Sequence, residues 1–211
     1  MDKIVNFSVP HLSEHIFEFL DDDQLVQCRE VSLTWRALID EIIVKRWRDN
    51  LIRAFGHGHL GIVKVLVDHI PDLNAKGQYG FTPLISACKH GRADVVKILL
   101  KIPEIDFNLE DNSGKTPFMW ACRSGHASVV RLLLGHKHRI DFNKKDQQTE
   151  SAFMMACQYG HVGVVQLLIG QSNYDIDYTA KDMYGTTGLA KASMFKNKEV
   201  IELLWWGYFH L

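Results

Sequence analysis

The chain has 211 residues, of which 46% are hydrophobic and 23% charged, as is typical of a folded globular protein. Its formal net charge of -1 lacks the basic surplus that would hold phosphates or an acidic membrane. We therefore expect neither nucleic acid nor a membrane as a partner. Residues 1–10 also lack the charged start and continuous apolar run of a signal peptide.

The cysteines indicate the compartment. Cys28, Cys88, Cys122 and Cys157 lie inside apolar helical patterns and form no CxxC pair. Such spacing favours reduced thiols over a disulfide framework. We expect a cytoplasmic or nuclear protein.

The first fifty residues show short amphipathic helical patterns, broken at the acidic run 21–23. About forty residues of this kind are too few to bury a core of their own. The segment therefore needs a partner surface. Its apolar stripes are Leu12, Ile16, Phe19 and Leu20, followed by Leu25, Cys28, Val31, Trp35, Leu38 and Ile42.

The same segment resembles the F-box. Val9-Pro10 stands where that family has Leu-Pro, and Val31 is followed by Trp35-Arg36 and a terminal Trp47. F-box helices dock their apolar faces onto a Skp-type linker protein, which a cullin scaffold holds. The resemblance implies an F-box over residues 7–48 and a linker-binding set of Val9, Pro10, Leu12, Ile16, Leu20, Leu25, Val31, Trp35 and Leu38.

The rest of the chain, after the first fifty residues, consists of internal sequence repeats. Similar segments begin at Phe81, Lys115 and Glu150. An equivalent alanine recurs at steps of 33 to 36 residues, which defines five units. Those alanines are Ala54, Ala87, Ala121, Ala156 and Ala192.

Each unit predicts two short antiparallel helices. Thr82-Pro83 and Thr116-Pro117 supply a capping hydroxyl followed by a proline, the order that starts a helix. Gly91, Gly125 and Gly160 suit the left-handed position that ends it. The second helix carries an apolar stripe that one unit cannot bury alone, so the units must stack.

This pattern resembles the ankyrin repeat, which implies an all-α solenoid of helix-turn-helix units with β-turn or hairpin loops. None of the units has the family's histidine after Thr-Pro-Leu. Apolar packing is therefore expected to replace the hydrogen bond that ties repeats together. The expected repeats are 49–79 (degenerate), 80–113, 114–147, 148–184 and 185–211, the last a degenerate cap.

Ankyrin proteins bind targets through hairpin tips and exposed first-helix positions. Transferred to this chain, the resemblance implies a target-binding set of Tyr79, Phe81, Lys115, Arg123, Tyr159, Met183, Tyr184 and Phe195. Its five aromatic residues are expected to be the anchors. Alternatively, Phe81 and Phe195 pack on neighbouring loops.

No catalytic, metal or cofactor site is expected. Cys122/His126 and Cys157/His161 have helical metal-pair spacing, but they occupy repeat positions that recur for packing reasons. The aromatic tail from residue 203 either folds back to cap the last repeat or docks a partner.

The two resemblances together imply a non-enzymatic substrate-recognition subunit of a cullin-type ubiquitin ligase, which binds an unidentified target protein. No Gly, Ser or Pro linker separates the two parts, so a rigid arm is expected. The alternative is a plain ankyrin scaffold or inhibitor whose N-terminal helices only cap the solenoid. A parasite or viral effector that borrows a host ligase would share the first mechanism.

Overall fold

The computed structural model describes residues 21–31, 39–40, 42, 51–170 and 175–210, without the side chains of residues 22, 29–31 and 206–210. These residues form eleven α-helices and no strand, apart from one isolated bridge between Lys145 and Ser151. The expected all-α class is confirmed. Among the same residues, no helix has the length and hydrophobicity to cross a bilayer.

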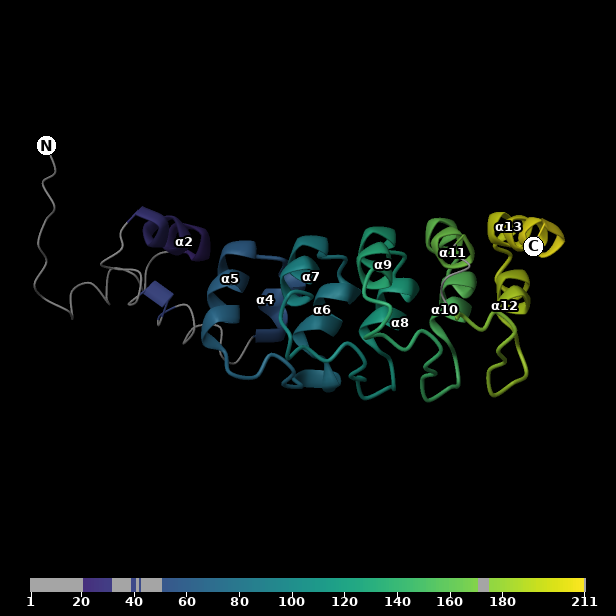
Figure 1. Ribbon diagram of the computed structural model, residues 1–211, viewed down its shortest axis with the longest axis horizontal. Coiled ribbons are helices and arrows are strands. Elements are labelled where there is room, and N and C mark those ends of the chain that lie inside the picture. The colour runs from purple at the N-terminus through teal and green to yellow at the C-terminus, as the bar shows by residue number, and fades with distance from the viewer. Residues whose placement is uncertain (1–20, 32–38, 41, 43–50, 171–174, 211) are drawn as a thin grey trace, which may run out of the picture.

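Helix α2 (Asp22–Val31) is followed by five helix pairs that succeed one another along the long axis (Figure 1). A short 3-10 helix, η2 (Gln78–Gly80), lies between the first two pairs. The pairs are α4 (Leu51–His57) with α5 (Leu60–His69), α6 (Pro83–Lys89) with α7 (Ala93–Leu99), α8 (Pro117–Arg123) with α9 (Ala127–Leu134), α10 (Ala152–Gln158) with α11 (Val162–Ile169), and α12 (Gly188–Met194) with α13 (Lys198–His210).

The helix starts follow the capping pattern read from the sequence. Each cap hydroxyl accepts the backbone N–H three residues later, at 3.2 to 3.4 Å. Serine and threonine at this position satisfy an N–H that the helix itself leaves unpaired. The four caps are Thr82, Thr116, Ser151 and Thr187.

The helix ends use a left-handed residue. Gly91, Gly125 and Gly160 have φ of +68°, +74° and +71°, where a Cβ would be strained. The last repeat places Lys196 at the same position with φ of +60°.

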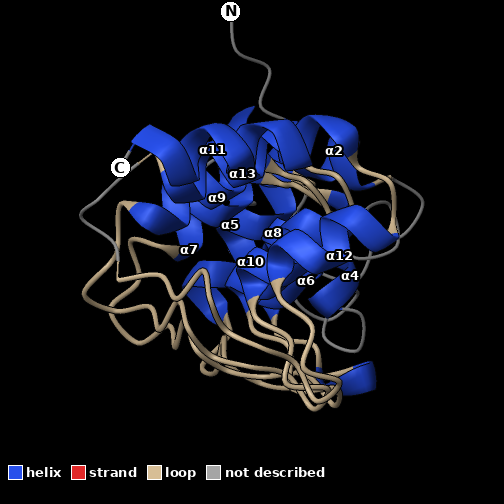
Figure 2. Ribbon diagram, turned by 90° about the vertical axis from the view of Figure 1, so that its right-hand side faces the viewer, coloured by secondary structure: helices blue, strands red, loops and turns tan. Residues whose placement is uncertain are grey.

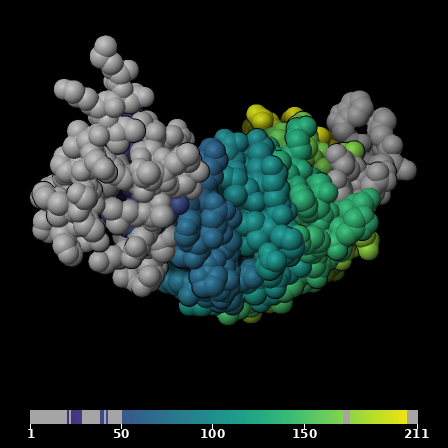
Figure 3. Space-filling model, turned by 60° about the vertical axis from the view of Figure 1, so that its left-hand side comes forward, coloured from purple at the N-terminus to yellow at the C-terminus, as the bar shows by residue number. Residues whose placement is uncertain are grey.

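The helices form two layers, and the loops between pairs extend to one side of them (Figure 2). The row α4, α6, α8, α10 and α12 packs more closely along the stack than the row α5 to α13 does. Its five equivalent alanines are completely buried, which allows this approach. The stack therefore curves toward the first row, whose exposed side is called the inner face below. Figure 3 shows the repeats as adjoining bands of colour.

Hydrogen bonds from other positions also tie consecutive repeats together, beside the apolar packing that was expected to replace the absent histidine bond. The residue after each left-handed position reaches back to a carbonyl of the preceding repeat. Arg92 Nε donates to Gly56, and Nε2 of His126 and His161 donates to Lys89 and Arg123. Asn197 Nδ2 donates to both Cys157 and Gln158 in the last repeat.

Helix α2 packs directly on the first repeat. Leu25 is completely buried within the core that continues into α5. Val26 lies so near Gly61 that a Cβ there would approach its methyl group to 2.7 Å. Leu25 is thus covered by the chain itself, which corrects its assignment to the linker-binding surface. Val31 closes α2 with no described side chain, and Val9, Pro10, Leu12, Ile16, Leu20, Trp35 and Leu38 lie outside the described residues.

The repeat thiols are buried and stay protonated. Burial raises the pKa of Cys157 to about 12, and it raises the pKa of Cys88 and Cys122 still further above the usual range. Only a thiolate is nucleophilic. Cys28 is only half-buried.

We predict that iodoacetamide at pH 8 alkylates Cys28 first in the folded chain. The three repeat cysteines should react on the order of a thousandfold more slowly, because so little thiolate forms. Mass spectrometry of tryptic peptides over time measures this difference. All four should react at similar rates in 8 M urea, and equal rates without urea would contradict the prediction.

Candidate protein-binding face

The hairpin tips are shaped by three equivalent aspartates. Oδ1 of Asp111, Asp146 and Asp182 accepts the backbone N–H groups two and four residues later, at 2.8 to 3.0 Å. Backbone bonds also join one tip to the next, such as Asn112 N–H to the Tyr79 carbonyl. The tips form a continuous, ordered edge beside the inner face.

The tips expose large side chains at both ends of the stack. Tyr79 is 66% exposed in the first tip, and Met183 and Tyr184 are 60% and 80% exposed in the last. All three lie where the sequence placed target-binding residues.

Lys115 does not belong to this exposed set, and its assignment to target binding is corrected. It is 7% exposed, and its Nζ lies 2.7 Å from Oδ2 of Asp146. The Asp146 carboxylate is buried at the base of the next hairpin and needs a cation beside it. Lys115 supplies that charge, so it joins two repeats and is unavailable to a partner.

A second buried ion cluster lies at the end of the stack. Lys191 Nζ contacts Glu150, and it lies 3.0 Å from Oδ2 of Asp182. Burial raises the pKa of Asp182, but the N–H groups of Thr186 and Tyr184 and the Lys191 ammonium lower it more, so the net pKa lies below its usual value. Burial lowers the pKa of Lys191, yet its two carboxylate partners leave it raised.

An alternating series of rings and cations crosses the inner face from the second repeat to the fourth. Lys89 Nζ lies 4.5 Å from the Phe81 ring centre and 4.7 Å from that of Trp120. Arg123 Cζ lies 5.4 Å from the Trp120 ring and 5.0 Å from the Tyr159 ring. Cations over aromatic faces are held by the ring quadrupole. We call Phe81, Lys89, Trp120, Arg123 and Tyr159 the cation–aromatic row.

The sequence left open whether Phe81 and Phe195 bind a target or pack on neighbouring loops, and the structure distinguishes the two residues. Phe81 packs edge-on against Trp120, with ring centres 5.6 Å apart, so it belongs partly to the fold. Phe195 is 55% exposed at the far end of the face. Tyr159 is 44% exposed within the row, and Arg123 is half-buried there.

Sequence reasoning missed Trp120. Its Nε1 donates to Oδ2 of Asp111 at 2.8 Å, which fixes the indole plane between the two cations. The available signal was a tryptophan at an inner-helix position where the other four repeats carry Arg53, Ser86, Met155 and Lys191.

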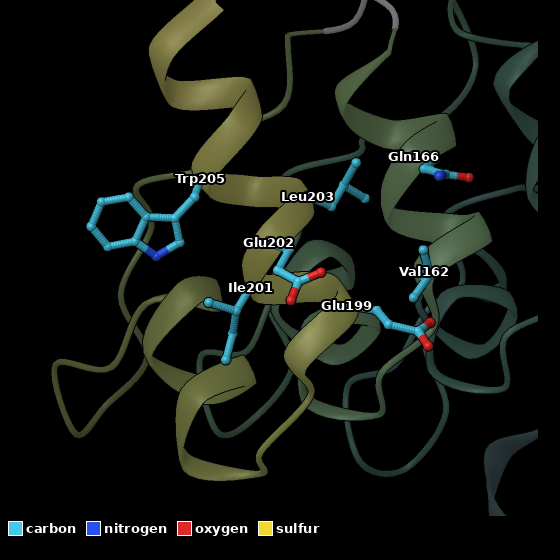
Figure 4. A pocket seen from close by; sticks show the side chains of 7 residues that line it. All are labelled: Val162, Gln166, Glu199, Ile201, Glu202, Leu203 and Trp205. Atoms are coloured by element: carbon cyan, nitrogen blue, oxygen red, sulfur yellow. The ribbon is translucent and has the colours of Figure 1, made fainter.

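A shallow groove lies between α11 and α13 (Figure 4). Helix α13 continues through His210, so its backbone does not fold back over the last repeat. Trp205 is 55% exposed beside Glu202 and Leu203. This end therefore presents an apolar ring next to acidic groups.

The two Cys/His pairs serve the fold. Cys122 and Cys157 are completely buried, while His126 and His161 bond to carbonyls of the preceding repeat. Within the part of the chain that the structure describes, no three His, Cys, Asp or Glu side chains gather as metal ligands would.

Comparison with known families agrees with this architecture. A family model described as ankyrin repeats (3 copies) matches residues 51–146 and again 138–208. The chain therefore belongs to the ankyrin-repeat family. A second model, the F-box domain, matches residues 9–47, so this member is an F-box protein with ankyrin repeats. No curated protein sequence matches the chain.

Proposed function

We propose that the protein is the substrate-recognition subunit of a Skp-cullin-F-box type ubiquitin ligase. The observation that carries this proposal is the order of its parts, an F-box domain over residues 9–47 followed at once by repeats from residue 51. The F-box would bind a Skp-type linker and through it a cullin. The inner face of the repeats would bind the target protein.

The mechanism is proximity. A target held at a fixed place beside a ubiquitin-charged enzyme meets it at a high effective concentration. The chain itself then needs no catalytic residue or cofactor, and we propose that it is not an enzyme. The buried, protonated thiols suit a reducing cytoplasm or nucleus.

The packing of α2 on the first repeat is what a rigid arm would need. Helix α2 lies inside the matched F-box domain, and Leu25 and Val26 pack on α5 of the first repeat. The contact joins α2 to the solenoid, so a bound target would keep one position relative to α2.

The same contact favours a second candidate function. A helix that buries Leu25 against the first repeat also acts as a cap, as it would in a plain ankyrin scaffold or inhibitor. Binding to the linker separates the two candidates.

We predict that the full chain captures a purified Skp-type linker and that Ile16→Asp reduces capture at least about tenfold, since the charge would enter an apolar interface. Met194→Asp is the matched control, because Met194 is 70% exposed on α12, in the last repeat. It should leave capture unchanged. Wild-type protein that ignores the linker would remove the ligase assignment in favour of the scaffold.

A further inference from the structure

The inner face changes chemistry along its length. Two positions at the end of each inner helix form parallel rows across the repeats. One row begins with Gly56, Lys89 and Arg123 and continues through Gln158 and Met194. The other is His57, His90, Ser124, Tyr159 and Phe195. The first three repeats carry the two cations and two imidazoles of these rows, beside Gly56 and Ser124, whereas the last two repeats carry Met194, Tyr159 and Phe195 beside the polar Gln158.

Neither row contains an acidic residue, and the acids beside them are engaged. Asp111 accepts bonds from Ser113, Lys115 and Trp120. Asp146 pairs with Lys115, while Asp182 and Glu150 share Lys191. Asp146, Glu150 and Asp182 therefore pair with lysines outside the two rows, whereas Asp111 accepts only from neutral groups and keeps its negative charge beside Trp120.

Lys89 and Arg123 are the two cations in the middle of this face. Within the described residues neither forms an ion pair with a carboxylate, whereas Lys97, Lys115, Lys144 and Lys191 all do. Rings hold both cations in place, and the next repeat's histidine holds the carbonyl of each. A cation that is already positioned loses little side-chain entropy when an anion binds.

We infer that the inner face binds an extended acidic segment of a protein, with carboxylates at Lys89 and Arg123 and a large apolar side chain against Tyr159 and Phe195. The inference deepens the proposed function, on which it rests for the assignment of this face to the target. Charge complementarity favours this occupant. Lys89 and Arg123 are held in place by rings and can each bind a carboxylate of the partner.

The repeat geometry sets the spacing in that segment. Neighbouring helices pack about 8–10 Å apart, and an extended chain rises about 3.3 Å per residue. Residues that meet equivalent positions on successive repeats are therefore about three apart. The segment should carry two acidic residues at this interval and an apolar or aromatic residue about three to six positions beyond them.

The test is a selection of displayed random 12-residue peptides on the full chain, followed by fluorescence anisotropy with the enriched peptides. We expect enrichment of paired acidic residues with an apolar or aromatic residue to one side. The double variant Lys89→Met, Arg123→Met should weaken binding of these peptides about tenfold, as two screened ion pairs of about 0.7 kcal/mol each would give. Both methionines keep the apolar stem over the rings.

Two controls keep the result specific. Lys64→Met with Lys101→Met removes the same charge from exposed positions outside both inner-face rows and should leave affinity unchanged. Replacing the peptide's Glu and Asp by Gln and Asn should weaken binding to the unaltered protein about tenfold as well, whatever the fold of the variants.

Enrichment without acidic residues, or no enrichment, would overturn the inference. So would self-association of the full chain that the double variant abolishes, since a second copy would then occupy the face. Linker capture by the same preparations tests the proposed function separately. If the chain captures the linker but selects no acidic peptides, only the inferred chemistry of the bound segment is wrong. If it selects acidic peptides but does not capture the linker, only the assignment to a ubiquitin ligase is wrong.

Discussion

Lys191→Met is expected to lower the free energy of unfolding by about 3–5 kcal/mol, the usual cost of breaking a buried ion pair. The methionine would leave Glu150 and Asp182 side chains that are 12% and 2% exposed without their cation. Urea denaturation followed by circular dichroism measures the change. Lys144→Met is the control, since its pair with Glu110 is 31% and 41% exposed and should contribute at most about 1 kcal/mol.

Adding Glu150→Gln and Asp182→Asn to Lys191→Met should recover part of the loss, because the orphaned charges are then absent. Equal destabilisation by Lys191→Met and Lys144→Met would show that the buried cluster has no special role. No recovery in the triple variant would point to lost packing of the lysine stem instead.

The same cluster predicts a pH dependence. The pKa of Asp182 is lowered in the folded chain, so its stabilisation is complete above the unfolded value of about 3.9 and is lost as the pH falls through the lower folded value. The pKa of Lys191 is raised, so its stabilisation is complete below about 10.4 and is lost as the pH rises through the higher folded value. The stability difference between wild type and Lys191→Met should therefore shrink below about pH 4 and above about pH 10.

The sequence predicted the solenoid well because its signals are local. A hydroxyl before Pro83 or Pro117 and a glycine at 91, 125 or 160 act within one turn of helix. The periodic alanines then place the units in register. Even the departures followed this logic, since Ser151 caps α10 as threonine does elsewhere and Lys196 adopts the left-handed conformation of the glycines.

The inner face was predicted less completely because its chemistry joins residues one repeat apart. Lys115 lies at an ordinary hairpin position, and only the approach of Asp146 from the next hairpin turns it inward. The role of Trp120 likewise depends on Lys89 and Arg123 from two different helices. A period of 33 to 36 residues says which positions are equivalent, but not which neighbours across the interface pair.

In the N-terminal part, too, the sequence shows which residues are apolar but not which surface they contact. A stripe of apolar residues indicates that Leu25 is buried, but it does not say whether a linker protein or the chain itself covers it. The described contact with α5 settles this for Leu25. The partner of the other stripe residues is a question for the linker experiment.

Gly125→Ala is expected to destabilise the protein by about 3 kcal/mol for two reasons. A residue with a Cβ at φ of +74° costs about 1–2 kcal/mol. The new methyl group would also lie 2.5 Å from Nδ1 of His161, displacing the ring that donates to the Arg123 carbonyl. Loss of that hydrogen bond costs about 1–2 kcal/mol more.

Gly163→Ala is the control: it makes the same substitution, but the expected change in the free energy of unfolding has the opposite sign. Gly163 lies in helix α11, and an added Cβ would meet only Ala127, at 4.0 Å. Alanine there should stabilise the chain by up to about 1 kcal/mol, because glycine is the poorer helix former. The two substitutions should shift the midpoint of urea denaturation in opposite directions.

Because each repeat contacts only its neighbours, the Gly125→Ala defect should also weaken coupling between the third and fourth repeats. Hydrogen exchange would report this as faster exchange from α10 to α13 than in α6 and α7, and uniform acceleration along the stack would contradict it.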